Sequence, residues 1–112
     1  MTPNARRPPP PFVASADPGA VRVQTDADGA APALRVLGFG LTAPGVYERA
    51  VRGDQDTADL FAALRDAGYC FARGWGRSPA DVFEFLRDRR LLAGGFRSIA
   101  WRAPKRWVVR DE

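Results

Sequence analysis

The chain contains no histidine and only one cysteine, Cys70, and these absences narrow the chemistry that it can perform. Histidine is the commonest general base and the commonest transition-metal ligand, so Ser-His-Asp and Cys-His mechanisms are excluded. A single cysteine forms no intrachain disulfide and no cysteine cluster that could hold zinc. Because Cys70 lies between Tyr69 and Phe71, we expect it to be buried as a small apolar residue.

Lysine is nearly absent as well, because all but one of the 17 basic residues are arginine. The one lysine, Lys105, is expected in a polar turn, where it is a poor candidate for catalysis. The glycines form neither a G-x-G-x-x-G pattern nor a P-loop, so the sequence gives no support for nucleotide binding. We therefore expect a protein that is not an enzyme and that carries no cofactor or metal.

Long apolar runs are also missing. The longest uncharged run, Val36 to Val46, is interrupted by glycines and a proline, whereas a membrane span needs about 20 apolar residues. Near the N-terminus, Arg6 and Arg7 are followed by four prolines, and not by the apolar segment of a signal peptide. We expect a cytoplasmic protein that makes no contact with a membrane.

Proline is concentrated at the beginning of the chain and predicts a domain boundary. Residues 1–18 contain six prolines, which favour an extended polyproline II path. We interpret this segment as a tail or arm, which is either disordered or docked on a partner through Phe12 and Val13. Residues 19–112 then form a single α+β domain.

Periodicity and turn residues predict the elements of that domain. We expect strands at 21–25 and 34–39, helices at 57–67 and 79–93, a short strand at 69–73, and strands at 96–102 and 106–110. Residues 46–51 are ambiguous and are compatible with one or two helical turns. The order β-β-(α)-α-β-α-β-β predicts an α+β fold, in which a small antiparallel sheet built from an N-terminal and a C-terminal hairpin packs against two main helices.

The second expected helix has the clearest start signal in the chain. Ser78 is a good N-cap, Pro79 occupies the first helical position, and Asp81 follows three residues after the cap. Gly94 and Gly95 are expected to end this helix. Its core-facing stripe comprises Val82, Phe85, Leu86 and Leu92 or Ala93, with Phe83 beside it, and the stripe of the first helix comprises Leu60, Phe61, Leu64 and Ala67.

Positive charge is concentrated near the C-terminus. Residues 87–110 hold eight basic residues and one acid, Asp88, which gives a net charge of +7. Because the whole chain carries +4, the rest of it carries −3. A mildly acidic body with a basic end indicates an acidic partner.

The C-terminal hairpin is the best candidate for a binding surface. It combines two indoles with four cations: Trp101, Trp107, Arg102, Lys105, Arg106 and Arg110. Guanidinium groups bind phosphate or carboxylate, and an indole stacks on a base or a guanidinium. Strand alternation puts Trp101 on one face with Arg97 and Ile99. The alternative interpretation is that both tryptophans are core residues and the arginines only solvate the outer face of the sheet.

Two further groups extend the candidate surface. Arg87 and Arg90 lie near the expected C-terminal end of the second helix, where cations also stabilise the helix dipole, and they join the hairpin only if they lie beside it. Trp75 and Arg77 lie in a glycine-rich loop, and Trp75 either folds back onto the core or is an exposed anchor.

These features predict a small, non-catalytic binding protein. Its basic, Trp-containing helix-hairpin surface is expected to engage an acidic partner, and nucleic acid or a nucleoprotein complex fits best. The alternative is a protein-interaction module, either an accessory subunit of a larger assembly or a small inhibitor of another protein, whose cations meet an acidic protein surface.

Overall fold

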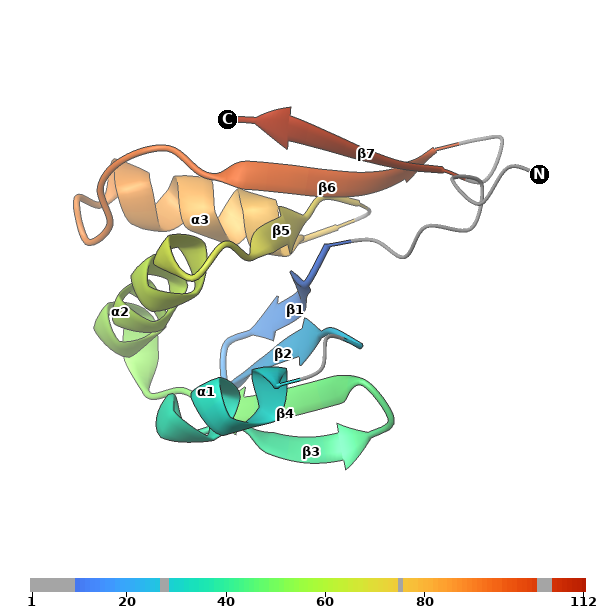
Figure 1. Ribbon diagram of the computed structural model, residues 1–112. Coiled ribbons are helices and arrows are strands. Elements are labelled where there is room, and N and C mark those ends of the chain that lie inside the picture. Colours follow the sequence, from blue (N-terminus) through green and yellow to red (C-terminus); the bar gives the residue numbers. More distant parts are fainter. Residues whose placement is uncertain (1–9, 27–28, 75, 103–105) are drawn as a thin grey trace.

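The computed structural model describes residues 10–26, 29–74, 76–102 and 106–112, and it contains ten secondary-structure elements (Figure 1). The strands are β1 (Phe12–Asp17), β2 (Ala20–Gln24), β3 (Gly40–Ala43), β4 (Val46–Ala50), β5 (Cys70–Ala72), β6 (Arg97–Arg102) and β7 (Arg106–Asp111). The helices are α1 (Ala30–Val36), α2 (Gly53–Asp66) and α3 (Pro79–Asp88). None of the helices in the described residues is long and apolar enough to cross a bilayer.

All seven strands form one sheet in the order β3-β4-β2-β1-β5-β6-β7. The expected α+β class is confirmed, but the expectation of a purely antiparallel sheet is wrong. Strand β5 pairs in parallel with both β1 and β6, while the other four pairings are antiparallel. The parallel β5–β6 pair follows from α3, because a helical crossover returns the chain to the same end of the sheet.

The domain begins earlier than the proline content predicts. Phe12–Asp17, expected within a tail that ended at residue 18, is strand β1 and lies between β2 and β5 near the middle of the sheet. Its apolar residues Phe12, Val13 and Ala16 are buried in the protein's own core and are not free to anchor a partner. The last proline before this strand, Pro11, still contributes its carbonyl, which accepts a hydrogen bond from the Cys70 N–H at 3.0 Å.

The middle of the chain differs from the prediction in two elements. Residues 34–39, expected as a strand paired with 21–25, belong largely to helix α1 and its C-terminal turn, so β2 pairs with β1 and β4 instead. Alanine, leucine and arginine favour a helix there, and Pro32 is tolerated in the first turn. The ambiguous segment at 46–51 is strand β4, which pairs with β3 across a turn at Pro44 and Gly45. Gly45 has φ +74°, which suits a turn with proline directly before it.

The two main helices are confirmed, but their ends differ from the expected ones. Helix α2 begins at Gly53, before the expected Thr57, and α3 ends at Asp88, before the expected Ala93. Arg90 adopts a left-handed φ of 61°, and the Leu91 N–H donates to the Leu86 carbonyl at 3.0 Å. This geometry is a helix-ending motif that usually uses glycine.

The helices bury a main core against one face of the sheet. Residues from all three helices pack there against Val13, Val21, Val23 and Phe71. The rings of Phe61, Phe71, Phe83 and Phe96 form one connected aromatic cluster in this core. Within α3, Phe83 is fully buried and Phe85 is 42% exposed, which reverses the expected roles of the two residues.

A second, smaller core lies on the other side of the sheet, which we call the helix-free face. Phe12, Cys70 and Ile99 are buried there, with Ala14, Ala72 and Trp107 packed against them. None of these residues comes from a helix. The expected burial of Cys70 is confirmed, and burial raises the pKa of its thiol.

Candidate nucleic-acid interface

The candidate site is the β6–β7 hairpin, which forms one edge of the sheet (Figure 1). Its predicted strands are confirmed, and the register pairs Trp101 with Trp107 and Arg102 with Arg106. Directly opposite residues of an antiparallel pair share a face, and neighbouring residues alternate between faces. The two indoles therefore lie on the helix-free face, and the two guanidinium groups lie on the opposite face.

Only one of the two indoles is freely accessible. Trp107 is partly buried against the second core, with its ring centroid 5.2 Å from that of Phe12. Trp101 is 51% exposed and meets Trp107 edge-to-face at a centroid distance of 5.0 Å. The three rings form a continuous row that runs from the second core to the surface. Trp107 is thus a supporting residue, and Trp101 is the residue that offers an indole surface to a ligand.

The opposite face of the hairpin presents three exposed arginines: Arg102, Arg106 and Arg110. No ion pair joins any of them to a carboxylate of the described residues. Arg102 and Arg106 are direct cross-strand partners, and like charges in that position destabilise a sheet. A pair of unneutralised cations at this point therefore costs stability.

Four arginines in the body of the domain are arranged differently, because each of them lies beside a carboxylate. Arg22 pairs with Asp17 and Glu48, Arg49 with Asp56, Arg65 with Asp66, and Arg73 with Asp81, Glu84 and Glu112. The distances between the paired N and O atoms lie between 2.7 and 3.5 Å. These four arginines are thus neutralised by neighbouring carboxylates, whereas Arg102, Arg106 and Arg110 form no ion pair with the described residues.

Arg73 also fixes the position of the hairpin. Its guanidinium lies 3.1 Å from Glu84 on α3 and 3.5 Å from Glu112, the residue after β7. The Glu112 carboxylate also accepts a hydrogen bond from the buried Ser98 hydroxyl of β6 at 2.6 Å. Burial lowers the pKa of Arg73, but its hydrogen bond to Glu84 and the surrounding carboxylates together raise the pKa above its usual value. This network joins β5, α3 and the hairpin.

The expected helix-hairpin surface is divided between two ends of β6. Arg87 donates to the Gly94 carbonyl at 3.2 Å and lies over the Phe96 ring, so it packs just before β6 begins. Arg97, the first residue of β6, donates to the Gly68 carbonyl at 3.1 Å. Arg102 is the last residue of the same strand, so Arg87 and Arg97 lie at the opposite end of β6 from the exposed Arg102 and Arg106.

Two of the remaining predicted site residues lie at the ends of α3 and not on the hairpin. Arg90 is exposed just after α3 in its left-handed conformation, and Arg77 is exposed just before α3. Trp75 and Lys105 lie outside the described residues. The candidate site is therefore Trp101 with its support Trp107 on one face, and Arg102, Arg106 and Arg110 on the other.

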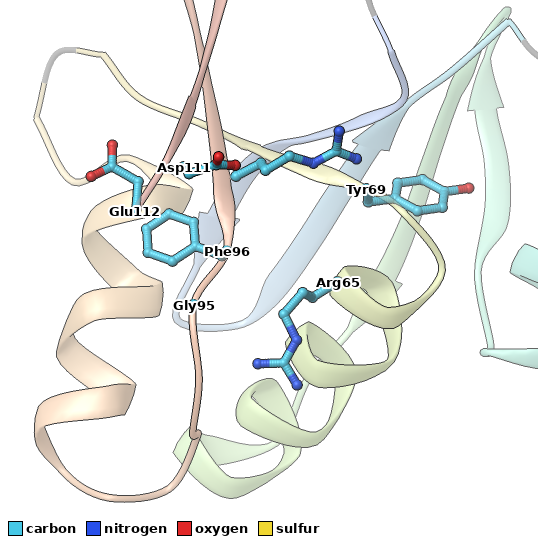
Figure 2. A pocket seen from close by; sticks show the side chains of 7 residues that line it. Arg65, Tyr69, Gly95, Phe96, Asp111 and Glu112 are labelled. Carbon is cyan, nitrogen blue, oxygen red and sulfur yellow. The ribbon is translucent and has the colours of Figure 1, made fainter.

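Sequence reasoning missed a surface hollow at the other end of the hairpin (Figure 2). Its volume is about 380 Å³, and its lining comprises Arg65, Tyr69, Gly95, Phe96, Arg97, Asp111 and Glu112. These residues come from four separate parts of the chain, so no local motif could have grouped them. The hollow mixes two cations with two acids, and it shows no preference for a ligand of one charge. A second hollow of about 310 Å³ lies between the β1–β2 turn and helices α2 and α3.

A comparison of the chain with protein-family models, curated proteins and solved structures found no match. Within the described ranges, no three His, Cys, Asp or Glu side chains gather as metal ligands would. The argument for function therefore rests on the geometry and charge of the hairpin.

Proposed function

We propose that this protein is a non-catalytic nucleic-acid-binding protein whose β6–β7 hairpin contacts the ligand. The observation that supports this most directly is the cross-strand pair Arg102 and Arg106, which lies at an exposed sheet edge with no carboxylate partner among the described residues. Phosphate groups supply the missing negative charge at close intervals. Arginine also matches phosphate geometry through paired N–H donors.

The hairpin is well placed for this contact. In Figure 1 the end of β6 and the beginning of β7 extend past α3, so neither strand is covered by a helix there. A two-stranded β-ribbon is narrow enough to approach a nucleic acid closely. Arg110 lies on the same face two residues beyond Val108 and extends the cationic row along β7.

Salt dependence is the first test of the proposal. Three phosphate contacts predict that log K falls against log salt concentration with a slope of about −2 for a single strand and about −3 for a duplex. Fluorescence anisotropy with a labelled oligonucleotide between about 50 and 200 mM salt measures this slope. If neither single-stranded nor duplex probes bind at the lowest salt, the proposal is wrong.

Matched charge removal is the second test. The double variant Arg102→Ala/Arg106→Ala removes two cations from the hairpin, and Arg35→Ala/Arg52→Ala removes two from exposed positions near α1 and α2. We expect the hairpin variant to lose at least tenfold in affinity at low salt, and the control to stay within about twofold of the original chain. Equal losses in both variants would mean that only net charge matters and that the hairpin is not the site.

A protein partner is the second candidate function, and one observation favours it. Strand β7 is an edge strand, and apolar surface is exposed by its own Val109 and by Trp101 on the neighbouring β6. A partner that adds a strand to this edge would use the free backbone groups of β7. A protein that co-purifies with the chain after nuclease treatment, and is lost in Val109→Arg, would support this alternative.

A further inference from the structure

The outer end of the hairpin presents two different chemistries on its two faces. Trp101 and Arg102 are consecutive residues of β6, so the indole and the guanidinium project to opposite sides of the ribbon. The same is true of Trp107 and Arg106 on β7. A ligand that uses both the exposed indole and the arginine pair must therefore reach around the edge or the end of the ribbon.

We propose that the ligand of this site is single-stranded nucleic acid, with an unpaired base stacked on Trp101 and adjacent phosphates bound by Arg102 and Arg106. This inference rests on the proposed function and specifies its ligand class. A single strand bends at every nucleotide and presents unpaired bases as well as phosphates. Stacking on an aromatic ring needs such an unpaired base and tolerates any sequence.

A duplex fits the same geometry poorly. Its major groove can admit a two-stranded ribbon, but its persistence length of about 150 base pairs prevents it from bending around one. Its bases are already stacked on each other, so a flat indole finds no free base surface without base extrusion. A duplex could contact the arginine face alone, and Trp101 on the helix-free face would then remain unused.

The surroundings of Trp101 favour stacking. Trp107 meets Trp101 edge-to-face, with an interplanar angle of 71°, and is itself in contact with Phe12. This support limits the orientations of the Trp101 ring before the ligand arrives, so less conformational freedom is lost on binding. Because the second core holds Trp107 in place, a flat ring surface is available at an otherwise charged edge.

The experiment compares three labelled probes, each about twelve nucleotides or base pairs long. This length matches the number of nucleotides that small single-strand-binding domains cover. The probes are oligothymidine, a strand of the same length with abasic sites, and a duplex. We expect Trp101→Ala to weaken the binding of oligothymidine by about tenfold and to change the binding of the abasic strand by no more than about twofold. Trp101→Phe, which keeps an aromatic ring, should restore most of the lost oligothymidine affinity. The original chain should bind oligothymidine more tightly than the duplex.

Other results would overturn this inference without overturning the proposed function. If the duplex binds as tightly as oligothymidine, or if Trp101→Ala changes the binding of the base-containing and abasic strands equally, the stacking contact is absent. Binding that depends on Arg102 and Arg106 would in that case still support a nucleic-acid-binding protein. If no probe binds at all, the proposed function itself fails. Circular dichroism of Trp101→Ala provides the folding control.

Discussion

The aromatic rings of Phe12 and Trp107 meet across the helix-free face, 5.2 Å apart at an angle of 44°, although β5 and β6 separate their strands in the sheet. Neighbouring strands lie about 4.8 Å apart, so the two large side chains reach toward each other over β5 and β6. The contact explains how Cys70 and Ile99 become fully buried on a side of the sheet where no helix packs.

Burial assigns different energetic roles to the two paired tryptophans. Because Trp107 packs on the second core and Trp101 is half exposed, we expect Trp107→Ala to lower the free energy of unfolding by about 2–3 kcal/mol. Trp101→Ala should lower it by less than about 1 kcal/mol. Urea unfolding followed by circular dichroism measures both values. Equal losses would show that the two indoles are equivalent and that Trp107 is not a support.

The arginine pair predicts a conflict between stability and binding. Arg106→Glu replaces a cross-strand repulsion with an attraction to Arg102, so we expect a gain in stability of about 0.2–1 kcal/mol. The same variant should lose nucleic-acid binding, because it puts a carboxylate where a phosphate is proposed to lie. Thermal unfolding and anisotropy titration measure the two effects. Arg106→Ala is the control, since it removes the repulsion without adding an attraction, and a less stable Arg106→Glu would contradict the electrostatic argument.

The start of α3 predicts an acid-sensitive contribution to stability. Asp81 accepts hydrogen bonds from the Ser78 hydroxyl at 2.8 Å and from the Ser78 N–H at 3.1 Å. The hydroxyl contact, the backbone contact and the charge of Arg73 hold the pKa of Asp81 below its usual 3.8. A carboxyl group whose pKa is lowered on folding stabilises the fold at every pH above its usual pKa. This contribution is lost as the pH falls through the lowered pKa.

We therefore expect Asp81→Asn to be less stable than the original chain at pH 7, and the difference to shrink below about pH 3.8. Since this carboxylate is 43% exposed, solvent screening limits the effect to about 1 kcal/mol. Ser78→Ala, which removes the side-chain cap itself, should cost about 0.5–2 kcal/mol at pH 7. Urea titrations at several pH values test both statements, and a difference that grows toward low pH would have the wrong sign.

The position of β1 predicts where the chain can be shortened. A chain that begins at Gly19 lacks the strand that joins β2 to β5, and we expect it not to fold. A chain that begins at Pro10 keeps all of β1 and should retain the circular dichroism spectrum and the cooperative unfolding of the original. If the shorter of the two chains folds cooperatively, β1 is dispensable and the sheet order must be different.

The sequence predicted correctly those elements whose structure is determined by interactions between residues close together in the chain. The Ser78 and Asp81 capping box and the two faces of the C-terminal hairpin both depend on residues close together in the chain. Alternation excludes a hairpin register that is slipped by one residue, because such a slip would exchange the two faces. The charge imbalance of the hairpin was also visible, since the sequence places its cations and acids directly.

The features that were missed depend on distant contacts. Nothing local distinguishes Phe83 from Phe85, and the contacts of Phe83 with Phe61, Phe71 and Phe96 decide which one is buried. The polyproline run also concealed β1, whose partners β2 and β5 lie further along the chain. Arg90 ended α3 in a conformation that arginine seldom adopts, so the later glycines gave a false boundary.

The free edge at β7 has a consequence for the solubility of the protein. An open edge strand invites a second copy to extend the sheet, and natural proteins oppose this with charge. Two copies that meet antiparallel with Val108 opposite Val108 would place Arg106 of each against Arg110 of the other, and like charges in that position repel. Neutralising these arginines thus removes a barrier to edge-to-edge aggregation, and Trp101 and Val109 would then widen the exposed apolar strip.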